Sequence, residues 1–182
     1  RLKLHTARMG RKGWHSRGYL PHMDAWSVVQ HAVFRLADAL PPRAQDIGDD
    51  LLDLGHGEAL LRNDACAQIV EAALLHHDGA HYRLHAWCVM PNHVHVLATI
   101  ERDAELGRIV RGWKSFSARL INRHLGRDGR LWAADYFDRF MRDGDHYETS
   151  KRYIEMNPVK AGLCATPQDW RWSSAYPRKP GE

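Results

Sequence analysis

Cysteine is scarce in this chain of 182 residues, which contains only three: Cys66, Cys88 and Cys164. They are odd in number and far apart, whereas a disulfide framework or a CxxC zinc site needs cysteines in closely spaced pairs. The pattern argues against both kinds of site. It favours a reducing compartment, so we expect a cytoplasmic protein.

Long apolar stretches are also missing. No run approaches the ~18 residues of a membrane-spanning helix, and the first residues lack the pattern of a signal peptide. Hydrophobic residues nevertheless make up 44% of the chain, which is typical of a globular protein. The length suits one domain with a hydrophobic core and is short for two.

Acidic residues are absent from residues 1–22, which carry six Lys and Arg. Residues 23–100 carry ten acidic and four basic side chains, and residues 101–182 carry twelve acidic and sixteen basic ones. Basic surface at both ends suits a polyanion such as nucleic acid, although charge alone is weak evidence for it. We interpret residues 1–22 as a basic N-terminal arm and residues 23–182 as a single domain.

Hydrophobic periodicity predicts the element order β-α-β-β-α-β-α. We expect one strand within 26–40 and further strands at 82–90, 93–100 and 131–142. Helices are expected at about 63–77, 105–125 and 145–157, the last ended by Pro158. This order is the split βαβ or ferredoxin-like plan. The predicted fold class is therefore α+β, an antiparallel sheet with helices packed on one face.

The stretch WCVMPNHVHVL (87–97) places two histidines alternately with valines after a tight turn. Successive side chains of a strand point to opposite faces, so His93 and His95 share one face while Val94 faces the core. Two imidazoles side by side on a strand could bind a metal ion. They could also be ordinary half-exposed strand residues.

The last predicted helix adds two polar residues to this pattern. Tyr153 and Asn157 are four residues apart, hence on one helical face. If that helix crosses the exposed face of the strands, His93, His95 and the Asn157 side-chain oxygen would form an open metal site beside Tyr153. Two imidazoles and an amide oxygen suit Mg²⁺ or Mn²⁺ acting on a phosphate.

Seven motifs spread along the chain are distinctive in combination. They are GWHSRGYLPH (13–22), LDLGHGEALLRND (52–64), VMPNHVHVL (89–97), WKSF (113–116), DYFDRF (135–140), RYIEMNPVKAGL (152–163) and DWRWSSAY (169–176). Together they resemble the REP-associated tyrosine transposases, relatives of the single-tyrosine HUH transposases of bacterial insertion sequences. The likeness covers nearly the whole chain.

The resemblance implies a metal-dependent endonuclease and strand transferase that acts on single-stranded DNA beside palindromic repeat hairpins, through a 5′-phosphotyrosine intermediate. His93 and His95 match the HUH histidines, Tyr153 the nucleophile on a C-terminal helix, and Asn157 the third metal-binding position. Mg²⁺ or Mn²⁺ is the implied cofactor. One departure is visible, because Met156-Asn157 stands where two adjacent asparagines are expected. The retained asparagine keeps its spacing from Tyr153.

Basic and aromatic side chains in two segments are candidates for DNA contacts by phosphate binding and base stacking. In the arm they are Arg11, Lys12, Trp14, Arg17 and Tyr19, and in the 105–125 helix they are Arg108, Arg111 and Lys114. Packing of the arm aromatics against the core, and simple solubility of the helix, are equally good explanations.

Other assignments compete with the main one. Tyr136 and Tyr147 are rival nucleophiles, but neither has a ligand-type residue four positions later. His85 is either a partner that orients the metal ligands or a buried, satisfied imidazole. The protein could instead bind repeat hairpins without cleaving them, or cleave RNA. It could be a monomer, or a homodimer whose subunits exchange the tyrosine helix.

Overall fold

The computed structural model describes residues 13–16, 21–24, 27–40 and 49–178. Within these ranges, four strands form one antiparallel sheet in the order β4-β5-β3-β6. The strands are β3 (Val29–Arg35), β4 (Tyr82–Val89), β5 (His93–Ile100) and β6 (Phe137–Phe140). Two short strands, β1 (Gly13–Ser16) and β2 (Pro21–Asp24), form a separate antiparallel ribbon at the position of the predicted arm.

Two long helices connect the strands of the four-stranded sheet. Helix α2 (Asp64–Leu75) lies between β3 and β4, and α3 (Leu106–Leu125) lies between β5 and β6. The order β3-α2-β4-β5-α3-β6, with β5 and β3 central, is the ferredoxin-like arrangement, so the predicted fold class is confirmed. Helix α4 (Gly144–Lys160) follows, and the shorter helical segments are α1 (Asp49–Asp53), η1 (Leu60–Arg62) and η2 (Pro167–Asp169).

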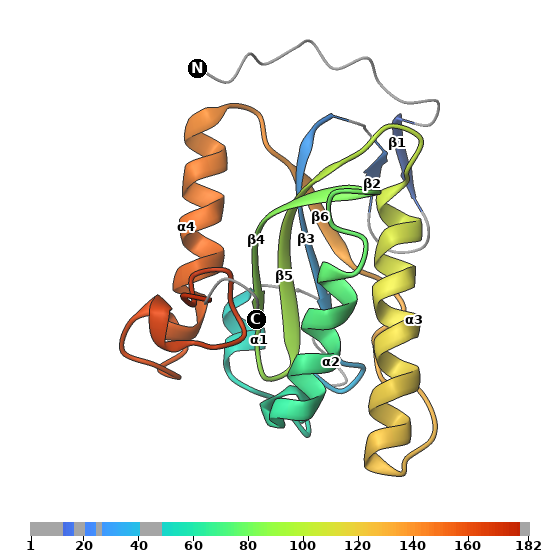
Figure 1. Ribbon diagram of the computed structural model, residues 1–182, viewed down its shortest axis with the longest axis vertical. Helices are drawn as coiled ribbons and strands as arrows, with labels where there is room; N and C mark the ends of the chain where they lie inside the picture. The colour runs from blue at the N-terminus through green and yellow to red at the C-terminus, as the bar shows by residue number, and fades with distance from the viewer. Residues whose placement is uncertain (1–12, 17–20, 25–26, 41–48, 179–182) are drawn as a thin grey trace.

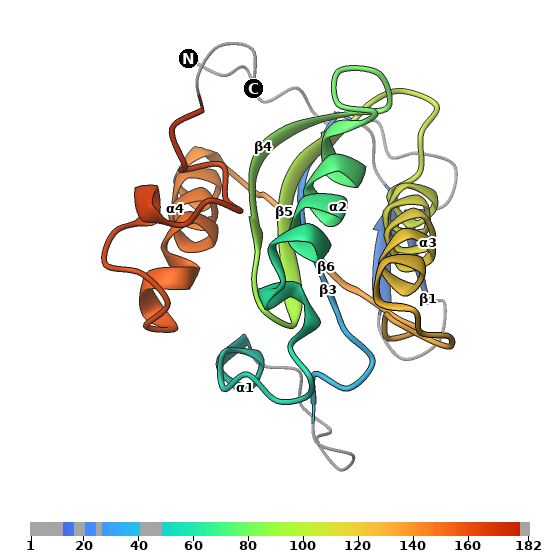
Figure 2. The same cartoon turned by 60° about the horizontal axis from the view of Figure 1, so that its bottom comes forward.

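The helices cover both faces of the sheet. Helices α2 and α3 lie side by side on one face, as the prediction expects, whereas α4 lies against the opposite face (Figures 1 and 2). None of the helices in the described ranges is both long and apolar enough to span a membrane.

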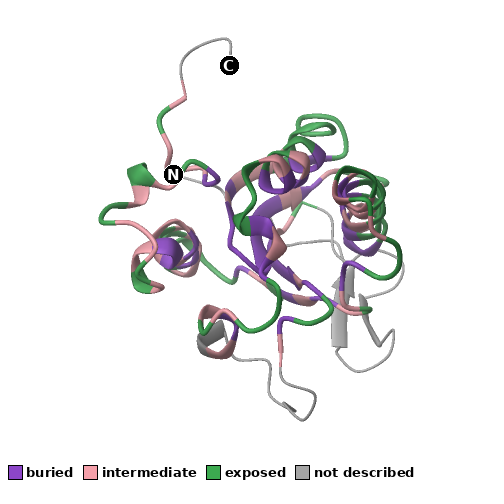
Figure 3. Ribbon diagram, turned by 90° about the horizontal axis from the view of Figure 1, so that it is seen from below, coloured by how far each residue is buried: buried purple, intermediate pink, exposed green. Residues whose placement is uncertain are grey.

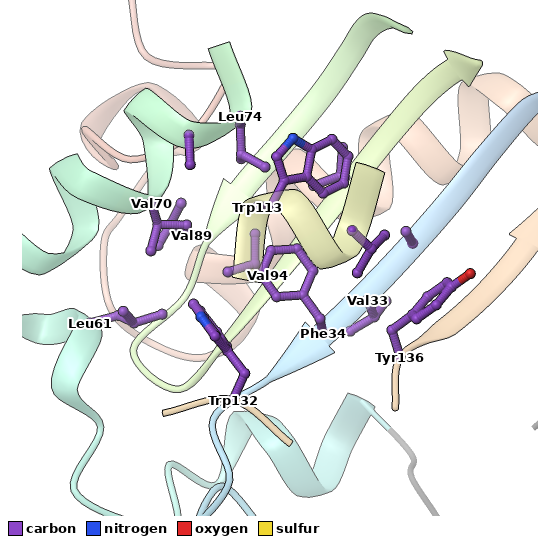
Figure 4. Close-up of a cluster of buried hydrophobic side chains, with 14 of the residues drawn as sticks. Val33, Phe34, Leu61, Val70, Leu74, Val89, Val94, Trp113, Trp132 and Tyr136 are labelled. Atoms are coloured by element: carbon purple, nitrogen blue, oxygen red, sulfur yellow. The ribbon is translucent and has the colours of Figure 1, made fainter. Parts of the chain in front are cut away.

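The main hydrophobic core lies between the sheet and the α2–α3 pair (Figure 4). Val94, Val96 and Ala98 point into it from β5, and Trp113 of α3 packs near Phe34 of β3 at 6.1 Å between ring centroids. The predicted alternation of β5 is therefore correct. Its apolar residues at even positions face the helices, which leaves His93 and His95 on the other face.

A smaller apolar cluster lies under α4. Ile154 is fully buried there against residues of β4 and β5, among them Cys88 and Leu97. As a result, the central strand β5 is covered on both faces and is buried almost throughout. Figure 3 shows buried segments gathered in the interior of the molecule. The histidines of β5 are consequently interior residues and not half-exposed ones.

The segment after α4 closes the edge of the sheet at β4. The backbone N–H of Val89 donates to Trp172 O at 2.8 Å, and that of Ser174 donates to Trp87 O at 3.0 Å. Both bonds satisfy groups that an open edge strand would expose to solvent. They also hold the segment after α4 against the strand beside β5, within the same chain.

Two predicted boundaries are wrong. The last strand is only four residues long, Phe137–Phe140, and Trp132 makes an isolated bridge to Leu36 instead of extending it. Helix α4 continues through Pro158 to Lys160. A proline removes one donor from the helix, but the N–H groups of Ala161 and Leu163 still reach Asn157 O and Pro158 O and complete the last turn.

Candidate active site

Strand β5 and helix α4 bring four predicted site residues together in one chain. His93, His95 and Asn157 are each 0% exposed, and Tyr153 is half-buried beside them. The Nε2 atoms of His93 and His95 are 3.0 Å apart, and Asn157 Nδ2 is 3.2 Å from His95 Nε2. The ring centroid of Tyr153 lies 5.9 Å from that of His95. The structure thus brings together the residues that the HxH pattern and the Tyr153–Asn157 spacing indicate, with the Asn157 nitrogen and not its oxygen facing His95.

Asn92, at the turn between β4 and β5, orients His93. Its amide Nδ2 donates to Leu52 O at 3.0 Å and His56 O at 3.2 Å, which turns Oδ1 toward His93 Nδ1 at 2.8 Å. Since an amide oxygen only accepts, His93 carries its hydrogen on Nδ1. The lone pair of His93 therefore sits on Nε2 and points at His95.

His31 of β3 is the corresponding neighbour of His95. Its Nε2 lies 3.1 Å from His95 Nδ1, and its ring is 6.4 Å from the Tyr153 ring. When His95 donates from Nδ1 to His31, its own lone pair is also on Nε2. Two lone pairs 3.0 Å apart repel each other unless a proton or a cation lies between them.

Burial keeps these imidazoles neutral. It lowers the pKa of His93 to about 3. Burial, helped by the nearby charges of Arg139 and His146, lowers the pKa of His31 to about 4. The pKa of His95 is well below its usual value because of burial first and then the charges of His93, His31 and Lys160. Neutral imidazole is the form that binds metal ions.

The donor set fits a small divalent cation. Two ligand atoms at right angles around an ion at about 2.1 Å lie about 3.0 Å apart, which matches the separation of the two Nε2 atoms. Asn157 Oδ1 is buried, and none of the described residues hydrogen-bonds to it. A half-turn of the amide would place this oxygen where Nδ2 now faces His95.

The chemistry of the set is mixed rather than rich in carboxylates. Within the described ranges, no group of three or more His, Cys, Asp or Glu side chains is arranged to hold a metal ion. The third donor proposed here is the amide oxygen of Asn157, which belongs to none of these four residue types. Asp53 Oδ1 lies 3.9 Å from His93 Nε2 and adds a negative charge at the edge of the site.

The predicted DNA-contacting residues of α3 do not lie at this site. Helix α3, with Arg108, Arg111 and Lys114, lies on the opposite face of the sheet (Figure 1). Arg108 pairs with Glu105, and the Lys114 ammonium donates to the carbonyl oxygens of Ala134 and Asp135. Trp14 lies in β1, and Arg11, Lys12, Arg17 and Tyr19 lie outside the described residues.

The competing residues have other partners. Tyr136 is buried in the core on the α3 side of the sheet (Figure 4). The Tyr147 hydroxyl and His85 Nδ1 are 3.4 Å apart, and His85 Nε2 is 2.7 Å from Thr99 Oγ1. His85 therefore pairs with Tyr147 and Thr99, and the neighbours that orient the site histidines are instead Asn92 and His31.

Three residues around the site escape an analysis of the sequence alone. Asn92 directly precedes His93, but its role depends on the carbonyl groups that it holds. His31 comes from a strand 64 positions before His95. Lys160 follows Pro158, beyond the predicted end of the helix. Its spacing of seven residues from Tyr153 is the one signal that could have revealed it.

Comparisons with known proteins show to which family the chain is similar. Residues 61–157 match the family model described as "Transposase IS200 like", a span that includes both histidines, Tyr153 and Asn157. A REP-associated tyrosine transposase of Escherichia coli K12 is 26% identical over 96 residues, which cover 52% of this chain and 55% of that protein. A Haemophilus influenzae protein assigned to the same group is 27% identical over 101 residues, covering 50% of this chain and 57% of that protein. The chain spans about half the length of these curated relatives.

A solved structure shares the fold. It is that of a REP-associated tyrosine transposase bound to a REP hairpin, and it superposes with a TM-score of 0.61 over 86% of this chain and 81% of that one. The sequence identity is 19%, so the match supports the common architecture and not the identity of particular residues.

The depressed histidine pKa values predict a pH-dependent stability. Between about pH 4 and pH 6.5 these histidines are protonated in the unfolded chain but stay unprotonated in the folded protein. The free energy of unfolding should therefore fall with decreasing pH. Each such histidine contributes up to about 1.4 kcal/mol per pH unit. Urea unfolding in EDTA at pH 7.0 and 5.5 measures this loss. The wild type should lose more stability than His31→Gln, and equal losses would contradict burial of a neutral His31.

Asn92 offers a test of how the site is oriented. Asn92→Ala removes the acceptor of His93 Nδ1–H, and loss of such a partner typically weakens metal binding about 10- to 100-fold. Asn92→Asp keeps an acceptor for His93 but loses the donor to Leu52 O and His56 O, which should cost about 1–3 kcal/mol of stability. Mn²⁺ titration calorimetry with urea unfolding separates the two effects. Wild-type Mn²⁺ affinity in Asn92→Ala would refute this role.

Proposed function

The chain belongs to the IS200-like transposase family, and we propose that it is a metal-dependent nuclease and strand transferase of single-stranded DNA. The observation that carries the proposal is the convergence of Tyr153 on two buried, neutral imidazoles and a buried amide within one chain. The substrate would be the single-stranded flank of a REP-type hairpin, as suggested by the names of the relatives.

Tyr153 would be the nucleophile. Its phenol oxygen attacks the phosphorus, the bond from phosphorus to the 3′ oxygen breaks, the phenol loses its proton and the departing 3′ oxygen gains one. The product is a 5′-phosphotyrosine that conserves the energy of the phosphodiester. Attack on this link by another 3′ hydroxyl therefore rejoins DNA without a nucleotide cofactor.

A free phenol is a poor nucleophile at neutral pH because its pKa is about 10. His93, His95 and Asn157 would hold Mg²⁺ or Mn²⁺, which withdraws charge from the phosphate and fixes its orientation when bound. Asn92 keeps His93 in the tautomer that leaves Nε2 free, and His31 would do the same for His95 by accepting from its Nδ1. Ile154, one residue after Tyr153, packs the helix against the sheet and thereby fixes the position of the phenol relative to the strands.

Preference for single strands follows from the position of the phenol. Tyr153 is half-buried between α4 and the sheet, so the attacked phosphate must approach this junction closely. A single strand can bend its backbone to line up the 3′ oxygen with the attacking oxygen, whereas the backbone of a duplex is held by base pairing. The hairpin would serve for recognition and the flank for cleavage.

A covalent adduct assay tests this function. A labelled oligonucleotide with a repeat hairpin and a single-stranded flank, incubated with Mn²⁺, should yield a protein–DNA adduct that survives denaturant. Tyr153→Phe should lower adduct formation by about 10⁴-fold or more, as loss of a nucleophile does. Tyr147→Phe is the matched control and should keep wild-type activity, since that hydroxyl pairs with His85.

The alternatives give different results in the same assay. A gel shift without an adduct would indicate a protein that binds hairpins and does not cleave them. Cleavage of the RNA version alone would indicate a ribonuclease. An undiminished adduct in Tyr153→Phe would exclude Tyr153 as the nucleophile.

A further inference from the structure

Lys160 shares a face of α4 with Tyr153 and Asn157. The three residues are spaced i, i+4 and i+7, which places them in one row along a helix. This row exists only because α4 continues past Pro158. Lys160 is thus the last residue of the helix and the last member of the row that faces the site.

The Lys160 ammonium lies directly over the phenol of Tyr153. Its Nζ is 4.1 Å from the centroid of the Tyr153 ring, and its charge contributes to the lowered pKa of His95. The side chain is exposed, and in the described part of the chain no carboxylate pairs with it. A positive charge is therefore held at the phenol and remains accessible to a ligand.

A positive charge at this position would balance the negative charge of a bound phosphodiester. Tyr153 and Asn157, the other two members of the row, carry a phenol and an amide, so Lys160 is the member that can bring a positive charge to a phosphodiester. A phosphate within reach of the Tyr153 hydroxyl also comes within reach of the flexible lysine side chain. A contact between an exposed ammonium and a ring face is weak, so the ammonium can leave the ring for a phosphate oxygen.

We propose that Lys160 is a catalytic residue that binds the phosphate attacked by Tyr153 and neutralises its charge during the displacement. The proposal rests on the function proposed above. The competing explanation is structural, since a cation in the last turn of a helix interacts favourably with the helix dipole. The two differ in what they predict for DNA.

Kinetics of adduct formation provide the first test. With a saturating hairpin oligonucleotide and Mn²⁺, Lys160→Met should slow the single-turnover rate by about 10²-fold, the usual effect of removing one charge-stabilising group. Lys160→Arg, which keeps the charge, should stay within about 10-fold of the wild type. Lys151→Met is the matched control. Lys151 lies on the same helix, two residues before Tyr153, and so points about 200° away from it around the helix axis. Lys151→Met should therefore form the adduct at the wild-type rate.

Equilibrium binding provides a test that needs no cleavage. In a Tyr153→Phe background, fluorescence anisotropy with the same oligonucleotide at increasing salt gives the number of phosphates neutralised. Lys160→Met should reduce the slope of log affinity against log salt by about 0.7, the contribution of one phosphate contact on a single strand. Thermal unfolding of each variant shows whether the fold is intact.

The outcomes separate the two proposals. A slower rate and a smaller salt slope in folded Lys160→Met support the role of Lys160. An unchanged rate in a protein that forms the adduct overturns it, as does an equal loss in Lys160→Arg and Lys160→Met. If the wild type forms no adduct at all, the proposed function fails. The salt slope then decides alone whether Lys160 binds a phosphate, and an unchanged slope rejects it.

Discussion

Two neutral imidazoles facing each other in the interior are the constraint on which the rest of this structure depends. The Nε2 atoms of His93 and His95 are 3.0 Å apart, with both side chains fully buried. Buried polar groups destabilise a fold unless they are paired. Here Asn92 and His31 take up the outer nitrogens, while the inner nitrogens meet each other and the Asn157 amide. A hydrogen on His95 Nε2, with Nδ1 accepting from His31, satisfies the arrangement while each ring stays neutral, and a divalent cation between the inner nitrogens satisfies it equally.

The fold achieves this by covering the sheet on both faces. The α2–α3 pair buries the valine side of β5, and α4 buries the histidine side through Ile154. The segment after α4 hydrogen-bonds to the edge strand β4, so the same chain that carries the histidines also holds the tyrosine helix in place. The position and rotation of α4 relative to the sheet then decide which side chains meet the imidazoles. These are Tyr153 and Asn157, and Lys160 lies over the Tyr153 ring.

Local patterns were sufficient to predict much of this molecule from its sequence. The alternation of β5 revealed which face carries His93 and His95, and the spacing of Tyr153 and Asn157 placed both on one helical face. These features depend only on the periods of strands and helices. The interior position of the histidines could not be predicted in this way, because it depends on α4 crossing the sheet.

Two features of the site could not be predicted from the sequence: the contact of His31 with His95, which is long-range, and the continuation of α4 past Pro158. His31 reaches His95 through strand pairing, which no local pattern reports. The predicted end of α4 at Pro158 followed the general rule for prolines, yet the helix absorbs the missing donor near its end. Because the helix was predicted to end there, Lys160 was not expected to lie on the same helical face as Tyr153. Charge alone makes the basic residues of α3 candidates for DNA contacts, and the topology places them on the face of the sheet opposite the site.

The central claim is that the inner nitrogens of His93 and His95 form a cation site together with Asn157. Anomalous scattering at the manganese edge, from crystals grown with Mn²⁺, tests it most directly. The account predicts an anomalous peak within about 2.3 Å of both Nε2 atoms, with the Asn157 amide turned so that its oxygen faces the ion. Crystals that bind Mn²⁺ elsewhere, with the two imidazoles still hydrogen-bonded directly to each other, would contradict it.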